Sequence, residues 1–385
     1  MDIFSQDKQY IANTYKRFPL AIESGKGSVL SGTDSKEYID LSSGIAVNIF
    51  GACDEVWQQA VAQQTQRIAH ASNLYYTQPQ VELAELLCKK TGMKKVFFGN
   101  SGAEANECAI KTARKYSFDK YGAGRSKIVT LRNGFHGRTI ATLSATGQDA
   151  MHKYFDPFLE GFDYAHPNDI DDTLSRMTDD CAAVMMELIQ GEGGVNVLDE
   201  EYVDAVAKEC SQRDILLIID EVQTGNGRTG KLYCYEHYGI YPDIVTTAKG
   251  LGGGLPIGAV LFGEKTENTL SYGVHGSTFG GNPVCAAGAL SIVKRLDDEL
   301  FEQVRSKGEY LKAELLKLPK VEEVSGMGLM IGVKTTLPAS QVAAECLEKG
   351  LMVLTAKENV RLLPALNISF ELLERAVAIL GEVLS

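Results

Sequence analysis

Short hydrophobic runs recur along the middle of the chain, and each is followed by small or polar residues. Five of them lie before residue 250: Val96–Phe98, Lys127–Leu131, Ala182–Met186, Ile215–Ile219 and Ile244–Thr247. Strands that are buried on both faces show such continuous runs, whereas half-exposed strands alternate. Most of the intervals leave room for a crossover helix, so the pattern predicts an α/β fold with a mostly parallel sheet.

The next run, Ala259–Phe262, follows Ile244–Thr247 after the glycine-rich segment GLGGGLPIG. This segment is too short for a helical crossover, and the strand is therefore predicted to run antiparallel. We expect residues 46–282 to form a large domain around this sheet.

The pattern changes after Pro283, where a long helix is predicted over Val284–Leu318. Shorter elements follow: strands at Val321–Ser325 and Leu329–Val333, a helix at Gln341–Lys349 and a terminal helix from Glu371. This mixture predicts a smaller α+β domain over residues 283–385. Residues 1–45 are expected to pack with it as an N-terminal segment.

Composition narrows the class of protein. The 385 residues are 44% hydrophobic and 23% charged, as in folded globular chains, and the net charge is −12. No basic run interrupts this acidic balance, so nucleic acid is not an expected partner. Neither a membrane helix of roughly 20 apolar residues nor a secretory signal is apparent, and a cytoplasmic protein is expected. The eight cysteines are too widely spaced for a zinc site, so no metal is expected.

An aspartate and a lysine each follow a predicted buried strand. Asp220 closes the run Ile215–Ile219, which puts its carboxylate at the carboxyl edge of the sheet, where open α/β sheets bind ligands. Lys249 follows Ile244–Thr247, where partial desolvation lowers the pKa of an amine and favours its attack on a carbonyl. Gln223 adds a neutral donor and acceptor nearby. Considered alone, Asp220 is equally consistent with a helix cap or with one partner of an ion pair. Considered alone, Lys249 is more typical of a surface residue.

The segment NSGAEANE follows the run Val96–Phe98 and opens a predicted helix. Backbone N–H groups and the positive end of the helix dipole then meet at Gly102 and Ala103, which favours an anion or phosphate site. The same letters also describe a simple capping box, with Ser101 as the cap and Glu104 three residues later.

Aromatic and basic residues supply further candidates. Phe135 follows the run Lys127–Leu131 and either stacks on a planar ligand or belongs to the core. Arg138 and Arg361 are candidates for bidentate binding of carboxylates, with surface arginines as the alternative. Glu192, in a glycine-rich segment, is expected to pair with one of them.

One motif is typical of a different kind of binding site. Gly225–Gly230 matches the dinucleotide-binding pattern GxGxxG, but it begins five residues after Asp220 and no helix is predicted to open on it. Hydride transfer with a dinucleotide is therefore not the favoured chemistry.

Ten motifs occur together in an order typical of one family. They are FPLAIESGKG, SSGIAVN, NSGAEANE, FHGRT, ELIQGEGG, IIDEVQTGNGRTG, TTAKGLGGGLPIGA, HGSTFGGNP, GMGLMIG and RLLP. On these motifs the chain resembles the class III pyridoxal-phosphate (PLP) aminotransferases, and within them the acetylornithine branch. The resemblance implies the fold type I architecture of PLP-dependent transferases, with one antiparallel strand in the mostly parallel sheet of the large domain.

The resemblance also implies roles toward PLP. Lys249 would bond covalently to its aldehyde and then act as the catalytic base. Asp220 would keep the pyridine nitrogen protonated, Gln223 would bond the phenolic oxygen, and Phe135 would stack on the ring.

The remaining cofactor contacts would come from other segments. Gly102 and Ala103 would hold the phosphate, and Thr278 would reach it from the neighbouring subunit of a homodimer with shared active sites. Glu221 and Val222 complete the implied set.

For the substrates, the resemblance implies a small-molecule amino donor and 2-oxoglutarate. Ser277 and Arg138 would contact the amino-acid substrate. Arg361 would bind the α-carboxylate in the 2-oxoglutarate half-reaction and would pair with Glu192 when the other substrate binds. The acetylornithine branch acts in arginine biosynthesis and forms N-acetylglutamate 5-semialdehyde and glutamate.

Several alternatives remain open at this point. The donor is alternatively succinylornithine, ornithine, an N-acetyl-lysine-type compound or 4-aminobutyrate, and the protein is alternatively an aminomutase or a non-catalytic PLP-binding protein. The chain departs from the family pattern at Ala52–Glu55, at Leu188 and at Asn226, where a larger and often sulfur-bearing residue is common. Cys53 and Asn226 are expected to bear on the substrate channel.

Overall fold

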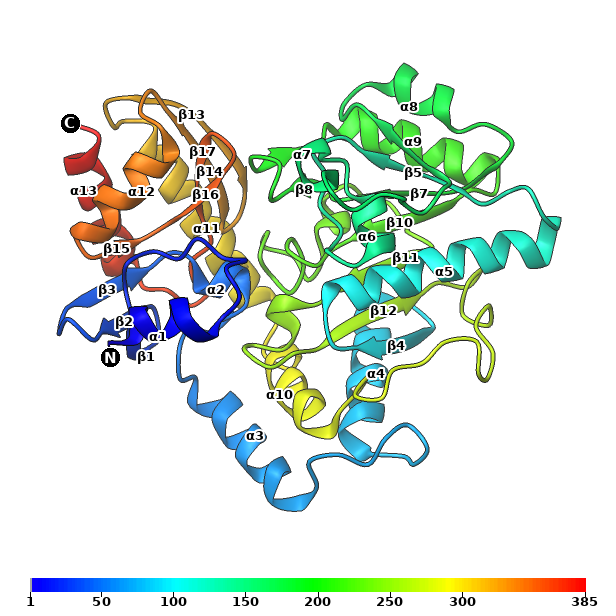
Figure 1. Cartoon of the computed structure of the whole chain (residues 1–385), viewed down its shortest axis with the longest axis horizontal. Coiled ribbons are helices and arrows are strands. Elements are labelled where there is room, and N and C mark those ends of the chain that lie inside the picture. The colour runs from blue at the N-terminus through cyan, green and yellow to red at the C-terminus, as the bar shows by residue number, and fades with distance from the viewer. Residues whose placement is uncertain (1) are drawn as a thin grey trace.

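The computed structural model describes residues 2–385, with a seven-stranded sheet on one side and two four-stranded sheets on the other (Figure 1). The strand order of the large sheet is β4-β12-β11-β10-β7-β5-β6. Its strands are β4 (Lys95–Gly99), β5 (Lys127–Leu131), β6 (Phe162–Ala165), β7 (Cys181–Met186), β10 (Leu216–Asp220), β11 (Ile244–Thr247) and β12 (Gly258–Phe262).

Pairing in the large sheet is parallel except at β12, which runs antiparallel to both β11 and β4. The predicted α/β class and the antiparallel strand are confirmed, and the predicted strands end within one residue of the observed ones. The edge strand β6 was not predicted, because its residues FDYA are mostly only partly buried and form no continuous apolar run.

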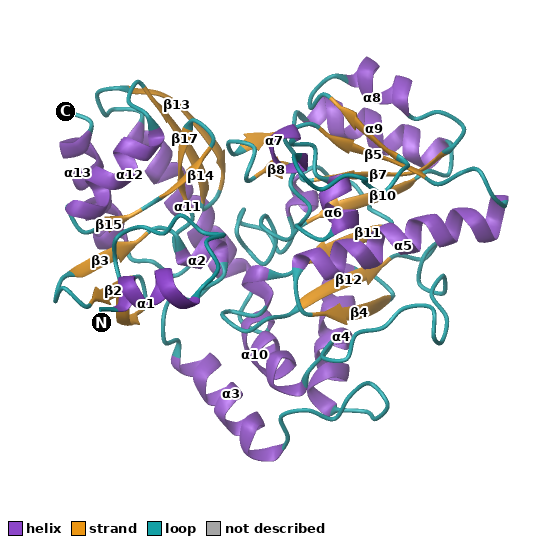
Figure 2. Cartoon of the chain, in the orientation of Figure 1, coloured by secondary structure: helices purple, strands orange, loops and turns teal. Residues whose placement is uncertain are grey.

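Helices connect the strands and cover the large sheet (Figure 2). Helix α5 (Gly102–Tyr121) follows β4 and packs against β11 and β12, and α9 (Glu200–Gln212) packs on β10. The same region contains α3 (Glu55–Arg67), α4 (Gln78–Thr91), α6 (Ile140–Ala145), α7 (Asp149–His152), α8 (Ile170–Arg176), the 3-10 turns at Cys234–His237 and Lys249–Leu251, and the hairpin of β8 (Ile189–Gln190) and β9 (Asn196–Val197). Helix α2 (Ser43–Ala46) lies on the side of the smaller sheets (Figure 1) and contacts the turn at Lys249–Leu251.

The prediction of one long helix over Val284–Leu318 is wrong. The structure has two helices, α10 (Pro283–Val293) and α11 (Asp298–Leu315). Asp297 caps the second one by accepting from the Leu300 N–H at 2.9 Å. The break lets α10 pack against α3 and α4 beside the large sheet while α11 packs on a second sheet.

The second sheet has the order β13-β14-β17-β16 and is covered by α11 and two further helices. Its elements are β13 (Val321–Met327), β14 (Met330–Thr335), α12 (Ala339–Glu348), β16 (Leu354–Ala356), β17 (Asn359–Leu362) and α13 (Phe370–Val383). The predicted strands and helices after residue 320 are thereby confirmed, whereas the domain limits stay a prediction.

The N-terminal segment forms a third sheet. After α1 (Ile3–Tyr10), strands β1 (Ile22–Lys26), β2 (Val29–Gly32) and β3 (Glu37–Asp40) pair antiparallel, and β3 pairs parallel with β15 (Leu351–Met352). The two ends of the chain therefore meet in one sheet.

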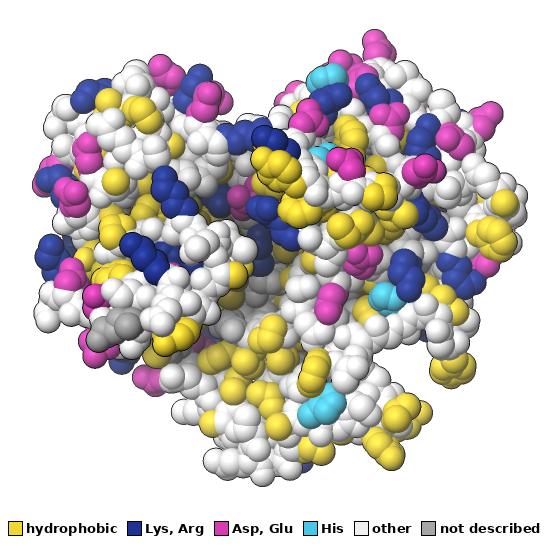
Figure 3. Space-filling view, viewed as in Figure 1, with side chains coloured by type: hydrophobic (Ala, Val, Ile, Leu, Met, Phe, Trp, Pro, Cys, Tyr) yellow, Lys and Arg dark blue, Asp and Glu magenta, His cyan; other side chains and the backbone are white. Residues whose placement is uncertain are grey.

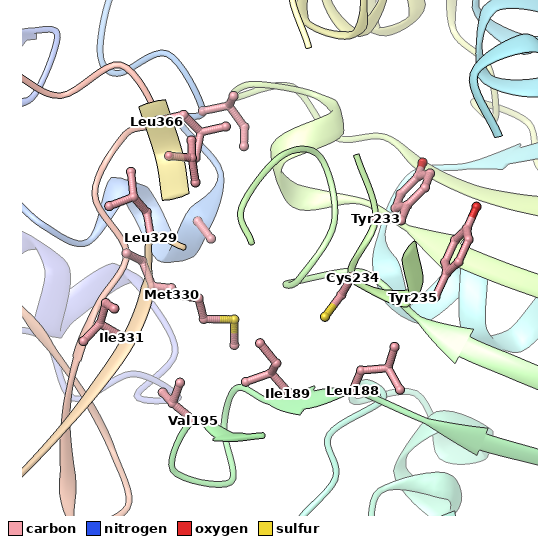
Figure 4. Close-up of a cluster of buried hydrophobic side chains, with 14 of the residues drawn as sticks. Leu188, Ile189, Val195, Tyr233, Cys234, Tyr235, Leu329, Met330, Ile331 and Leu366 are labelled. Atoms are coloured by element: carbon pink, nitrogen blue, oxygen red, sulfur yellow. The ribbon is translucent and has the colours of Figure 1, made fainter. Parts of the chain in front are cut away.

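Buried apolar side chains join the large sheet to the second one (Figure 4). Leu188, Ile189 and Val195, around the β8–β9 hairpin, are fully buried together with Leu329 and Met330 from the turn into β14. Among residues 2–385, no helix has both the length and the apolar content to cross a membrane.

Candidate active site

The parallel strands of the large sheet end at one edge, and the segments that follow them surround a cavity of about 480 Å³. On the face shown in Figure 3, lysine and arginine side chains gather beside the hollow between the large sheet and the smaller ones. Asp220 ends β10 and Lys249 follows β11, and both line this cavity. They therefore meet where open α/β sheets bind ligands.

Asp220 is 3% exposed and accepts hydrogen bonds from three directions. Its Oδ2 accepts from Nδ2 of Asn106 and Nδ1 of His136, each at 2.8 Å, and its Oδ1 accepts from the Val222 N–H at 3.0 Å. Burial lowers the pKa of His136, but the hydrogen bond and charge of Asp220 outweigh it, so that this pKa is raised. The Asp220 carboxylate is thus held in place by a buried hydrogen bond from the His136 ring.

A second buried acid, Glu187, lies near this pair and lines the same cavity. Glu187 follows β7 and accepts from the backbone N–H of Phe135 at 2.8 Å and of Gly191 at 3.3 Å. Burial raises its pKa to about 7, although the charge of His136 acts in the opposite direction. Glu187 therefore fixes the loop that presents the Phe135 ring to the cavity.

Lys249 is partly buried and lies in a strained backbone conformation, with φ of 44°. Burial lowers the pKa of its amine, and the nearby carboxylate of Glu192 opposes that shift. A lowered pKa increases the neutral fraction of the amine, which is the form that attacks a carbonyl or accepts a proton.

The amino end of α5 forms the floor of an anion site. Ser101 caps the helix by accepting from the Glu104 N–H at 3.1 Å, whereas the Glu104 carboxylate accepts from Asn100, so only the serine half of the predicted capping box is present. The N–H groups of Gly102 and Ala103, at the first two helical positions, have no acceptor within the helix. A Cβ added at Gly102 would lie 2.7 Å from Cγ1 of Val222, so only glycine leaves this approach open.

Arg361 extends from β17 toward the same cavity and is 3% exposed. Its Nη1 donates to Oε1 of Glu192 at 2.6 Å, to the Gly191 carbonyl at 2.9 Å and to Oε1 of Gln223 at 3.1 Å. The charge of Arg361 lowers the pKa of Glu192 against the effect of burial, which is the larger influence taken alone. The predicted Arg361–Glu192 pair is therefore present.

Other predicted site residues lie at the rim of this cavity or outside it. Arg138 is exposed at the rim of the cavity, with its guanidinium 5.5 Å from the centre of the Phe135 ring. Ser277 and the exposed Thr278 line a separate hollow on their own chain, together with His275. Their roles toward substrate and toward a neighbouring subunit stay predictions.

Sequence reasoning missed three residues of the site: Asn106, His136 and Glu187. The first two lie within the motifs NSGAEANE and FHGRT, but only the fold brings them to Asp220. Glu187 follows a buried strand just as Asp220 does, and this signal would have found it. Gly225–Gly230 opens no helix, which agrees with the low weight given to its match.

Comparison with known proteins gives the family. The model of the class III aminotransferases matches residues 10–384. The chain is 50% identical to an acetylornithine aminotransferase from Haemophilus ducreyi over 382 residues, 98% of this chain and 97% of that one. The chain belongs to the class III aminotransferases. This assignment confirms the predicted enzyme class, and PLP is the cofactor of this family.

Two solved structures extend the likeness to three dimensions. An N-acetylornithine aminotransferase from Stenotrophomonas maltophilia is 34% identical, with a TM-score of 0.86 over 99% of this chain and 98% of that one. An ornithine aminotransferase from Toxoplasma gondii, described with partial occupancy of PLP at its active site, is 30% identical, with a TM-score of 0.94 over 99% and 93%.

The chemistry of the cavity fits PLP. Free N–H groups at Gly102 and Ala103 suit a phosphate, the Phe135 ring suits a flat heterocycle, Asp220 suits a protonated ring nitrogen, and the Lys249 amine suits an aldehyde.

Proposed function

We propose that the protein transfers the amino group of N2-acetylornithine to 2-oxoglutarate, a step of arginine biosynthesis, with Lys249 and Asp220 as catalytic residues. The observation that carries the proposal is the one cavity that both residues line, with the ion pair of buried Arg361 and partly buried Glu192 beside it. The half-identical relative from Haemophilus ducreyi, an acetylornithine aminotransferase, supports the choice of donor.

Residues from four strand ends would hold the cofactor. Lys249 would bind it covalently, Gly102 and Ala103 would donate to its phosphate, and Phe135 would stack on its ring. Gln223 would donate to its phenolic oxygen, beside the implied contacts of Glu221 and Val222. When bound, PLP supplies an aldehyde for the substrate amine and a ring that takes up the electron pair left when the C–H bond breaks.

Lys249 would move the proton. Because burial lowers the pKa of this amine, a larger fraction of Nζ is neutral, and this form would accept the proton from the substrate carbon and return it during product formation. Asp220, held by Asn106 and His136, would keep a proton on the ring nitrogen through a fixed carboxylate oxygen.

Arg361 and Glu192 would let one cavity accept two unlike substrates. When the donor binds, Glu192 neutralises Arg361, and the 2-oxo acid brings a carboxylate that competes with Glu192 for the guanidinium. Arg138, at the rim, and Ser277 would contact the amino-acid substrate.

Steady-state kinetics with purified protein and added PLP test this function. We expect kcat/KM for N2-acetylornithine to exceed the values for ornithine and 4-aminobutyrate by at least about tenfold, the effect of about 1.4 kcal/mol in transition-state binding. Ornithine is the second candidate, because an ornithine aminotransferase from Toxoplasma gondii aligns with a TM-score of 0.95. A higher kcat/KM for ornithine would contradict the proposed donor. The absence of amino transfer from every donor would contradict the proposed reaction.

We propose that the enzyme acts as a homodimer in the cytoplasm. Thr278 does not line the Lys249 cavity of its own chain, and in a dimer it would reach the phosphate in the partner's cavity. Large apolar side chains are exposed at Leu74 (86%), Tyr76 (99%) and Phe279 (58%), which supports a surface for association.

A further inference from the structure

The turn Gly225–Gly230 lies between the chain segments that carry Lys249 and Arg361. On one side, Asn226 bonds to the residues just before Lys249, and on the other, Arg228 bonds to the carbonyl of Pro364. We propose that this turn is a positioning element of the amino-transfer site, in which Asn226 fixes the backbone of Lys249 and Arg228 fixes the segment that carries Arg361. This inference rests on the proposed function.

Asn226 is 1% exposed and has φ of 57°, a left-handed conformation that asparagine tolerates better than most residues. Its Nδ2 donates to Oγ1 of Thr247 at 2.9 Å and to the carbonyl of Ala248 at 3.3 Å. Because a carbonyl oxygen only accepts, the NH₂ group must face the end of β11. Asn226 is also one of the positions at which the chain departs from the family pattern.

The peptide that precedes Lys249 needs such support. A residue other than glycine keeps a φ of 44° only where its surroundings hold it there. The Ala248 carbonyl is held by the Leu251 N–H at 2.9 Å, within the same turn, and by Asn226 from a different segment. Loss of the Asn226 amide would let this peptide rotate and would displace Nζ of Lys249 from its place in the cavity.

Arg228 acts on the other side of the turn. Its side chain is fully buried, and its Nη1 donates to the carbonyls of Leu329, at 3.1 Å, and of Pro364. The Arg228 carbonyl in turn accepts from the Leu329 N–H at 3.0 Å. Pro364 lies two residues after β17, the strand that carries Arg361, so this guanidinium ties that strand to the turn.

The Asn226 contact is tested with Asn226→Gly, because glycine adopts positive φ without strain and only the side-chain bonds are lost. We expect kcat to fall about tenfold while KM for both substrates changes by less than about twofold, since no group that would touch substrate is altered. Asn168→Gly is the matched control: Asn168 is exposed, has φ of 62° and accepts from the Asp199 N–H at 2.9 Å outside the cavity lining. Its kcat should equal that of the wild type.

A second readout does not depend on turnover. Cofactor-free protein is mixed with PLP, reduced with borohydride at timed intervals and digested, and mass spectrometry of the peptide that contains Lys249 gives the rate of capture. We expect capture to slow at least about fivefold in Asn226→Gly and not in Asn168→Gly. If the wild type transfers no amino group, the proposed function fails, and this rate still tests the Asn226 contact.

The Arg228 contact is tested with Arg228→Lys, which keeps the charge but loses the planar fork. We expect KM for 2-oxoglutarate to rise at least about fivefold, while kcat and KM for the donor stay within about twofold. Arg228→Gln, which keeps a donor group, should show the same selective rise if the lysine variant does not fold. The proposal would be overturned if a folded Asn226→Gly showed the kcat and capture rate of the wild type, or if Asn168→Gly lost as much of both. It would also be overturned if Arg228→Lys raised the KM values for the donor and for 2-oxoglutarate equally.

Discussion

Asp220 is held by two side chains that are distant in sequence and by one neighbouring N–H group. Replacement by alanine removes the carboxylate and leaves Asn106 and His136 in place. We expect Asp220→Ala to lower kcat by about 1,000-fold, as when a preorganised electrostatic partner is lost, while the protein keeps its circular dichroism spectrum. Unchanged turnover would refute the role of Asp220.

The matched control is Asp180→Ala. Asp180 directly precedes β7 at the opposite end of the large sheet, where its carboxylate pairs with Lys127 at 2.9 Å. Turnover should stay at the wild-type level in this variant, since Asp180 is about half exposed and does not line the cavity.

The sequence predicts Asp220 and Lys249 because each follows a buried apolar run, and strand ends of a parallel sheet share one edge. It does not predict Asn106 or His136 as partners of Asp220. They lie 114 and 84 residues away along the chain, and only helix α5 and the loop after β5 bring them there. Hydrogen-bond partners of this kind depend on tertiary packing, which local patterns do not contain.

Glu187 predicts a pH dependence of stability. Burial raises its pKa from 4.5 to about 7 in the folded protein, so between these values the folded state binds more protons than the unfolded chain. The free energy of unfolding therefore falls as the pH rises through this window. Glutamine does not titrate, so Glu187→Gln removes this contribution. The free energy of unfolding of this variant should therefore decrease less between pH 4.5 and 7 than that of the wild type.

Urea unfolding of the cofactor-free protein at several pH values measures this effect. Glu348→Gln, at the exposed end of α12, is the control and should keep the wild-type slope. An identical slope in Glu187→Gln and the wild type would contradict the assignment.

At the scale of elements, the amino end of α5 has no space for a side chain at Gly102. Alanine at Gly102 would bring a Cβ within 2.7 Å of Val222, whose branched side chain has little freedom to move. We expect Gly102→Ala to weaken PLP binding by at least about tenfold, as measured by absorbance titration of the cofactor-free protein. Gly381→Ala is the helical control, because the added Cβ there would lie 3.3 Å from the end of the Leu318 side chain.

Elements with continuous apolar runs are the ones that the sequence predicts well. The central strands β7, β10 and β11 are fully buried and end within one residue of their predicted limits. The break between α10 and α11 was missed, although Asp297 is a recognisable cap, because hydrophobic residues continue across it at helical spacing. Here packing against two different sheets decides the structure, and the local pattern does not reveal it.

At the scale of the molecule, the exposed apolar side chains predict that activity requires association. Tyr76 is 99% exposed in a segment between α3 and α4 that also exposes Leu74. We expect Tyr76→Asp to shift the protein from dimer to monomer in light scattering after gel filtration and to lower activity in parallel, since an isolated subunit would lack the partner's Thr278.

Tyr241→Asp is the control for this experiment. Tyr241 is 93% exposed, and it lies just before β11, away from Tyr76 along the chain. This variant should remain dimeric and active. A fully active monomer of Tyr76→Asp would contradict the need for a shared site.

Neighbouring parallel strands β10 and β11 carry Asp220 and lead to Lys249, whereas Arg361 is on β17 of the second sheet. Asp220 lies opposite Thr246 on β11, three residues before Lys249, so the relative position of the first two residues depends on one hydrogen-bonded ladder whose strands are about 4.8 Å apart. A rocking motion of the second sheet would carry Arg361 alone. Such a motion would change the distance from the guanidinium of Arg361 to the amine of Lys249, and it would leave the distance from that amine to Asp220 unchanged.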